Sequence, residues 1–374
     1  MDSCDAGSLP FTESRANRDK FLLGAVDYRL HSDKDLSDAG RYFEKKVVAS
    51  FIHKAQMGID IPYYPQFREM NHMFLSVFPD LEKLGERYVE ARGKSSETDV
   101  QLIPEVKAIR ENSKRISEEL HRPFELGVCI TGPYTLSSYL AVKNTTVFLR
   151  LANTIGQLFK ANIFSDKHAR VSMVSIDEPY FGTQDDPLVD PTSDGRENLR
   201  SAWQLIGNAS KFYSRSVKTC MHLHNTADKL FWEVESLDAV ESEVNNSLYQ
   251  SKETKRFLEV HDKLLKANVC RTNFDDLILE KLATQKGQKT EGNQEIVDIW
   301  RKIKAGKLDP TIFLEDTALI RKRITNLISK YGAERILCAA PECGLKGFPT
   351  YKSALECLKR VATAARSIKP EIRG

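Results

Sequence analysis

The stretch "FELGVCITG" (residues 124–132) is followed by "LANTIGQLFKANIF" (151–164) and then by "VSMVSID" (171–177). The first and third runs are short, apolar and rich in β-branched residues, which is typical of buried strands. The middle run has apolar residues at three- and four-residue spacing, which indicates an amphipathic helix. A strand, a helix and a second strand in this order are typical of an α/β protein.

The same alternation continues along the chain in both directions. A second helical pattern is "LIRKRITNLISKY" (319–331). Eight strands, each followed by a helix, predict a single (β/α)₈ TIM barrel, whereas a doubly wound open sheet is less well supported because no GxGxxG turn follows the first strand. The six other expected strands are "LLGAV" (22–26), "IDIPYY" (59–64), "KTCMHLH" (218–224), "LDAVESEV" (237–244), "ANVCRT" (267–272) and "RILCAA" (335–340).

Other segments lie outside a minimal barrel. Residues 1–19 are polar and aperiodic, which predicts a loose N-terminal arm before a catalytic barrel over 20–374. Residues 80–121 are expected to hold two charged helical stretches. Residues 285–316 form a polar insertion with a short helix, and its end "LDPTIFLED" (308–316) competes with the run chosen as the seventh strand. Neither residues 80–121 nor residues 285–316 have the features of a separate domain.

Composition excludes several classes of protein. The net charge is only +3 over 374 residues, and the basic residues are interspersed with acids, so nucleic acid is not an expected partner. The N-terminus lacks the pattern of a secretory signal, and no apolar run of about 18 residues predicts a membrane span. The seven cysteines form no CxxC pair, which favours a reducing cytoplasm with free or metal-bound thiols.

Candidate ligands for a metal follow the expected later strands. In a barrel, catalytic residues come from the C-terminal ends of the strands. His222 and His224 are two apart on one strand and can face the same pocket, while Glu243 ends the next strand and Cys343 follows the last. Imidazole, carboxylate and thiolate are ligands that Zn²⁺ prefers, so these four residues predict a zinc site able to bind a substrate thiol. Each alone has a simpler explanation as a buried or solvated residue.

Several blocks of the sequence resemble the catalytic C-terminal barrel of the cobalamin-independent methionine synthase superfamily. The likeness covers roughly residues 20–370 and is greatest to the short, single-barrel members. The blocks, in the order of the family, are "PQFREMNHMF" (65–74), "ITGPYT" (130–135), "IDEP" (176–179), "HLH" (222–224), "LDAVESEV" (237–244) and "PECGLK…SALECLKRVATAARSI" (341–368).

The resemblance implies that His222, Glu243 and Cys343 are zinc ligands. The remaining ligand of the family is a cysteine, and this chain has His224 there. Imidazole can replace thiolate on zinc, with one negative charge fewer, which makes the metal a stronger Lewis acid and its bound thiolate a weaker nucleophile.

The resemblance also implies a site for an amino-acid substrate. Asp177 matches the aspartate that receives the amino group of homocysteine, and the neighbouring Glu178 is expected to bind substrate too, unless these two acids merely end a strand before a proline. Gln66 lies in the block of the second strand. Where the family has Gly-Ser after its first strand, this chain has Gly24-Ala25, and the missing hydroxyl removes one hydrogen bond to a carboxylate, worth about 0.5–1.5 kcal/mol.

The expected activity is zinc-dependent methyl transfer to a thiol, most simply from a methylated corrinoid protein to homocysteine, which gives methionine. Coenzyme M as acceptor is the nearest alternative, favoured by Ala25 and His224. A decarboxylase of the uroporphyrinogen type shares the barrel but needs a basic rim, for which only Arg29, Arg68 and Lys346 are available. A barrel that only binds or scaffolds is the third possibility.

Some roles stay unassigned in the sequence. The family's general acid is a histidine near the seventh strand without a clear counterpart here. The nearby candidates are Cys270, Arg271 and Asp309. Cys220 is expected to be buried or to lie behind the site rather than to bind the metal.

Overall fold

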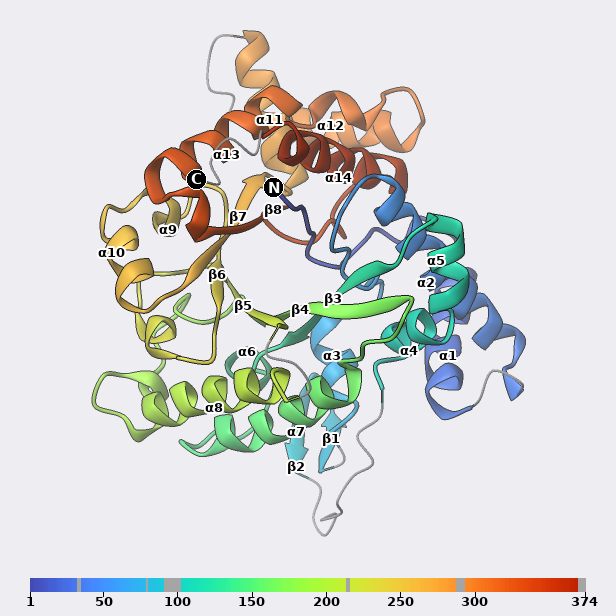
Figure 1. Ribbon diagram of the computed structural model, residues 1–374. Helices are drawn as coiled ribbons and strands as arrows, with labels where there is room; N and C mark the ends of the chain where they lie inside the picture. Colours follow the sequence, from blue (N-terminus) through green and yellow to red (C-terminus); the bar gives the residue numbers. More distant parts are fainter. Residues whose placement is uncertain (32–34, 79, 91–101, 213–215, 287–292, 369–374) are drawn as a thin grey trace.

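A curled sheet of six parallel strands forms the centre of the molecule, with helices packed around its outside (Figure 1). The computed structural model describes residues 1–31, 35–78, 80–90, 102–212, 216–286 and 293–368. Neighbouring strands follow the order of the sequence, as expected for a barrel. The strands are β3 (Phe124–Thr131), β4 (Ala169–Glu178), β5 (Lys218–Leu223), β6 (Ala239–Glu241), β7 (Leu264–Cys270) and β8 (Ile336–Pro341).

Two short extended segments complete the ring between β8 and β3. Ser3 forms a parallel bridge with Ala339 of β8, so the N-terminal segment lies beside the last strand. The segment 3–8 bridges in turn to the segment 61–66, through Cys4 with Ile61 and Ser8 with Gln66, and Tyr63 bridges to Gly127 of β3. The eight parallel segments confirm the TIM-barrel class predicted from the alternation of strands and helices.

The first strand of the barrel is therefore not where the sequence predicted it. Ser3, Cys4 and Asp5 are buried, so residues 1–19 are not a loose arm. The run "LLGAV" (22–26) lies inside the helix α1 (Arg15–Leu30), whose Ser14 accepts a hydrogen bond from Asn17 N. Its apolar residues belong to a helical face that is buried against α2 (Asp38–Gln56), which outweighs the strand-like composition of five residues.

The other helices surround the barrel and follow its strands. No helix among the described residues is long and apolar enough to cross a membrane. They are α3 (Met70–Leu75), α4 (Pro104–Glu111), α5 (Ser113–Leu120), α6 (Pro133–Ser137), α7 (Val147–Asn162), α8 (Asp194–Ser210), α9 (Ser247–Gln250), α10 (Glu253–Val260), α11 (Phe274–Lys286), α12 (Asn293–Lys304), α13 (Thr317–Tyr331) and α14 (Tyr351–Arg366).

The two longer segments have different structures. Within 80–121, a hairpin of β1 (Leu81–Leu84) and β2 (Arg87–Glu90) comes first, so only the second half is the helical region that was predicted. In the insertion 285–316, the short helix is α12, while residues 287–292 lie outside the described residues. The competing run 308–316 contains only a 3₁₀ turn, Pro310–Phe313, and the seventh strand is β7.

Candidate metal and substrate site

A cavity of about 390 Å³ opens among the C-terminal ends of the strands and extends into the barrel. Its wall includes five residues predicted from the sequence: Gln66, Asp177, His222, His224 and Cys343. It also includes residues for which no role was predicted, among them Ser8, Tyr63, Tyr180, Glu241, Lys266 and Gly344. Gly24, Glu178 and Glu243 do not line it.

Two histidines and one cysteine lie together in this cavity. One ligand atom from each of His222, His224 and Cys343 falls within 4.8 Å of the other two, and the thiol sulfur is 4.0 Å from His224 Nε2. The histidines are two apart at the end of β5 and their rings are 5.2 Å apart, as expected for alternate side chains on one face of a strand. Imidazole nitrogens and a thiolate are a donor set that suits Zn²⁺.

The thiol of this group is prepared to ionise. Burial raises the pKa of Cys343, but hydrogen bonding from His222 and His224 outweighs it and lowers that pKa to about 6. For His222, burial lowers the pKa, whereas the contacts with Cys343 and Glu241 raise it, and the net pKa is well above its ordinary value. A thiolate at neutral pH is the form that binds a metal.

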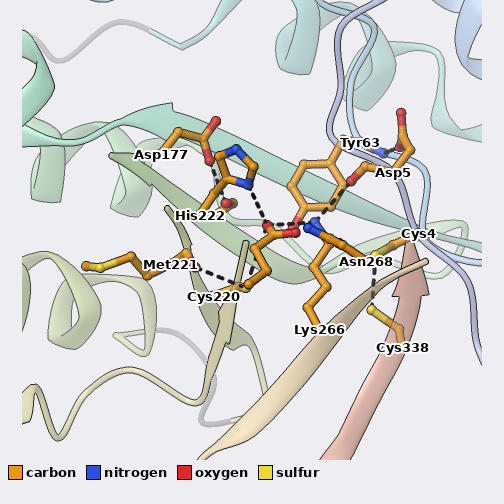
Figure 2. A network of polar contacts seen from close by, with 12 residues as sticks. Cys4, Asp5, Tyr63, Asp177, Cys220, Met221, His222, Lys266, Asn268 and Cys338 are labelled. Atoms are coloured by element: carbon orange, nitrogen blue, oxygen red, sulfur yellow. Dashed lines mark hydrogen bonds and ion pairs between the residues drawn. The ribbon is translucent and has the colours of Figure 1, made fainter. Parts of the chain in front are cut away.

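A buried ion pair lies behind His222. Glu241 of β6 is opposite His222 of β5 in the sheet, and its Oε1 is 3.6 Å from His222 Nδ1 and 2.9 Å from Lys266 Nζ. Figure 2 shows His222, Lys266 and Tyr63 converging on the same space inside the barrel. Burial raises the pKa of Glu241, but Lys266 and His222 lower it to about 2, so the carboxylate is charged.

Sequence reasoning missed this pair, although signals for it exist. Lys266 and Glu241 are charged residues inside otherwise apolar strand runs, "LLKANVC" and "AVE". A charged side chain that faces a barrel interior is almost always paired. A search restricted to residues at the ends of the expected strands passes over both, because Glu241 lies inside the predicted run 237–244 and Lys266 lies in the middle of β7.

Asp177 and Gln66 both lie on the wall of the cavity. Asp177 Oδ1 accepts a hydrogen bond of 2.6 Å from Ser175 Oγ. Burial raises the pKa of Asp177, while His222 and Ser175 lower it, and the net direction is upward. Gln66 is buried, and its Nε2 is 3.2 Å from Met73 Sδ. Both lie on strand ends that face the metal-ligand group across one cavity.

The predicted role of Gly24-Ala25 is wrong, since both are buried in α1 on the outside of the barrel. A Cβ at Gly24 would lie 2.1 Å from the carbonyl oxygen of Ala39 in α2, so this glycine permits close helix packing. A glycine–serine pair, Gly7-Ser8, lies in the first extended segment of the barrel, and Ser8 lines the cavity. The dipeptide at 7–8 is the sequence signal that would have pointed to this hydroxyl.

Glu178 has a structural role instead of the predicted contact with substrate. It is fully buried, and its two oxygens accept hydrogen bonds from Tyr134 N (2.9 Å), Thr135 N (2.7 Å) and Trp203 Nε1 (2.9 Å). It thereby holds the turn after β3 against α8. The carboxylate points away from the cavity that its neighbour Asp177 lines.

Glu243 and the other candidates lie outside the compact ligand group. Glu243 is half exposed, with Oε1 3.9 Å from His224 Nδ1. Cys220 is buried, 3.8 Å from Glu241 Oε1. None of the three candidates for a general acid lines the cavity: Cys270 contacts Cys357, Arg271 pairs with Glu280, and Asp309 caps the turn at Thr311.

Comparisons with known proteins agree on the architecture. No family model matches the chain, and no curated protein is similar in sequence. A vitamin-B12-independent methionine synthase from Shewanella sp. W3-18-1, solved in complex with selenomethionine, superposes over 98% of this chain and 97% of its own, with TM-score 0.59 and 12% identity. A putative vitamin-B12-independent methionine synthase from Listeria monocytogenes superposes over 99% and 100%, with TM-score 0.58 and 15% identity. The chain therefore has the fold of the cobalamin-independent methionine synthases along its whole length.

Proposed function

We propose that this protein is a zinc-dependent methyltransferase that methylates a thiol, with homocysteine as the acceptor and methionine as the product. The observation that carries this proposal is the presence of His222, His224 and Cys343 in the same cavity as Asp177 and Ser8. A soft-metal donor set beside an acid and a hydroxyl suits a substrate with a thiol at one end and an amino acid at the other. The solved structures of the same fold, which are described as methionine synthases, support it.

The donor set fits the proposed metal. Two imidazoles and one low-pKa thiol lie within 4.8 Å of one another, and His222 Nδ1 has no hydrogen-bond partner among the described residues. When bound, zinc supplies a Lewis acid that ionises a thiol and positions its sulfur.

The chain's own residues position the rest of the substrate. Asp177 and Ser8 both line the cavity, and in this proposal Asp177 receives the ammonium group of the substrate and Ser8 donates a hydrogen bond to its carboxylate. Gln66 lies beside Ser8, bridged to it through the backbone. In the reaction, the thiol releases its proton to solvent and its sulfur forms a bond to the methyl carbon. The bond between that carbon and the donor breaks, and its electron pair stays on the donor. Tyr139 and Tyr180, with ring centroids 6.4 Å apart, border the cavity and shield the reacting atoms from water.

The methyl donor that we propose is a methylated corrinoid protein in the cytoplasm. All seven cysteines are free, which fits a reducing compartment. Coenzyme M is a weaker candidate as acceptor than the sequence implied, since Ala25 lies away from the cavity and Ser8 lies in it.

A decarboxylase of the uroporphyrinogen type has less support. Of the three basic residues expected at its rim, Arg68 is held by Glu105 through two hydrogen bonds of 2.7 Å, and Arg29 does not line the cavity. Of these three residues, only Lys346 lines the cavity without such a carboxylate partner, and Lys266, which also lines the cavity, is paired with Glu241.

Metal analysis combined with a methyl-transfer assay tests the proposal. We expect about one zinc per chain and demethylation of methylcobalamin with homocysteine that exceeds the rates with coenzyme M and simple thiols. Cys343→Ala is expected to lose both zinc and activity, whereas His168→Ala, at the opposite end of β4, is expected to retain them. Absence of zinc from the wild-type protein, or no turnover with any thiol, would overturn the proposal.

A further inference from the structure

The two histidines of the candidate metal group have matching surroundings. His222 Nδ1 is 3.6 Å from Glu241 Oε1, and His224 Nδ1 is 3.9 Å from Glu243 Oε1. On the other side, His224 Nε2 is 4.0 Å from the sulfur of Cys343. Each ring therefore has a carboxylate at Nδ1, and Cys343 lies at the Nε2 side of His224.

The sheet explains the inner contact. His222 is directly opposite Glu241 in the pairing of β5 with β6. His224 and Glu243 lie just beyond the ends of these two strands, and Glu243 is half exposed. The outer histidine–carboxylate contact is therefore made by the loops that follow β5 and β6.

The inner carboxylate is fixed independently of any metal. Glu241 is 1% exposed, and Lys266, also 1% exposed, donates to its Oε1 at 2.9 Å. Glu241 Oε2 and His222 Nδ1 have no hydrogen-bond partner among the described residues. A buried imidazole nitrogen facing a buried carboxylate at 3.6 Å needs only a small shift to form an N–H···O bond.

We propose that Glu241 and Glu243 are positioning residues that accept hydrogen bonds from Nδ1 of His222 and His224, and that neither is a metal ligand. A metal bound here would be held by His222, His224 and Cys343, which would leave a fourth position for the substrate thiol. Carboxylates in this position fix the tautomer and orientation of a ligating histidine. This proposal rests on the proposed zinc site and replaces Glu243 as its fourth ligand.

The three-ligand site has a consequence for the substrate. Two neutral imidazoles and one thiolate leave a net charge of +1 on a divalent metal, and the incoming thiolate neutralises it. A thiol would fill the open position without displacing a protein side chain. The negative charges of Glu241 and Glu243 remain behind the ligands, with Lys266 balancing the inner one.

Zinc dissociation and cobalt spectra of the full-length protein test the assignment. Glu241→Gln and Glu243→Gln are compared with wild type and with Glu259→Gln, an exposed glutamate on α10. We expect zinc transfer to a chelator to be faster by about 10- to 100-fold in Glu241→Gln, by a smaller factor in the half-exposed Glu243→Gln, and unchanged in Glu259→Gln. Lys266→Met should resemble Glu241→Gln.

The Co²⁺-substituted proteins distinguish a ligand from a positioning residue. The d–d absorption bands of Glu243→Gln are expected to keep the wild-type positions, since the inner coordination is unchanged. A band shift in Glu243→Gln, or zinc dissociation within twofold of wild type in both variants, would overturn the inference. Because Glu243 is half exposed, its variant remains a test even if Glu241→Gln fails to fold. If the wild-type protein binds no zinc, the proposed function itself fails, which is a distinguishable result.

Discussion

Gly344 and Ser8 lie so close together that a Cβ on residue 344 would come within 2.0 Å of Ser8 Oγ. The contact joins the loop after β8 to the end of the first extended segment, and Leu345 N donates to the carbonyl oxygen of Ser8. Cys343 is therefore tied, through its neighbour, to the residue that we assign to the substrate carboxylate. The metal group and the amino-acid end of the site therefore meet where the loop after β8 packs against the first extended segment.

Ser8→Ala is expected to weaken binding of homocysteine without loss of zinc. Removal of one hydrogen bond costs about 0.5–1.5 kcal/mol, which corresponds to an increase in Kd of about 2- to 13-fold. Isothermal titration of the zinc-loaded protein measures it. Ala25→Ser, which adds a hydroxyl in α1, serves as the matched control and should leave Kd unchanged; equal Kd values for Ser8→Ala and wild type would remove Ser8 from the site.

Alkylation of Cys343 should follow the ionisation of a low-pKa thiol. In metal-free protein, the rate with iodoacetamide is expected to rise with pH to a plateau, with a midpoint near the pKa of about 6, because only the thiolate reacts. The other six cysteines are buried and provide an internal control when modified sites are mapped by mass spectrometry. Added zinc should protect Cys343, and His224→Ala should move the midpoint to higher pH. If the alkylation rate of the wild-type protein has its midpoint near pH 9, the two histidines do not lower the pKa of Cys343.

Glu178→Gln should reduce stability and leave substrate binding intact. Its two carboxylate oxygens accept three N–H groups, and an amide nitrogen in place of one oxygen would face a backbone donor. We expect a loss of about 1–3 kcal/mol in the free energy of unfolding, measured with urea. Asp177→Asn is the complementary variant, for which the larger change is expected in Kd. If Glu178→Gln is folded and stable but binds homocysteine more weakly than wild type, Glu178 contacts the substrate and the structural role alone is insufficient.

Glu105→Gln should be strongly destabilising. Its carboxylate is fully buried and bonds Nε and Nη2 of Arg68, both at 2.7 Å, so loss of the charge leaves a guanidinium without its counterion. A decrease of about 3–5 kcal/mol in the free energy of unfolding is expected. Glu118→Gln, which breaks an exposed pair with Lys114, should change it by less than about 1 kcal/mol. Similar urea midpoints for the two variants would show that the buried pair has little effect.

Much of the site could be predicted before the fold was known. His222 and His224 alternate on a run of apolar residues, and strand periodicity alone places them on one face. Cys343 and Asp177 directly follow apolar runs, where a barrel gathers its functional groups. The strands β3, β4, β5, β6, β7 and β8 all overlap the predicted runs, because buried parallel strands consist of short apolar segments that local composition reveals.

The sequence by itself determined the alternation of strands and helices, and the placement of His222 and His224 on one face of a strand. Barrel closure brings Cys343 to them from a distant part of the chain. Only the tertiary structure decided which segment begins the barrel. "SCDAGS" (3–8) has few apolar residues, and it is extended because β8 and residues 61–66 offer it backbone partners. The pairing register of β5 with β6 likewise decided that Glu241 faces His222. Periodicity is a property of neighbouring residues and can be read locally, whereas closure and register depend on contacts between residues far apart in the chain.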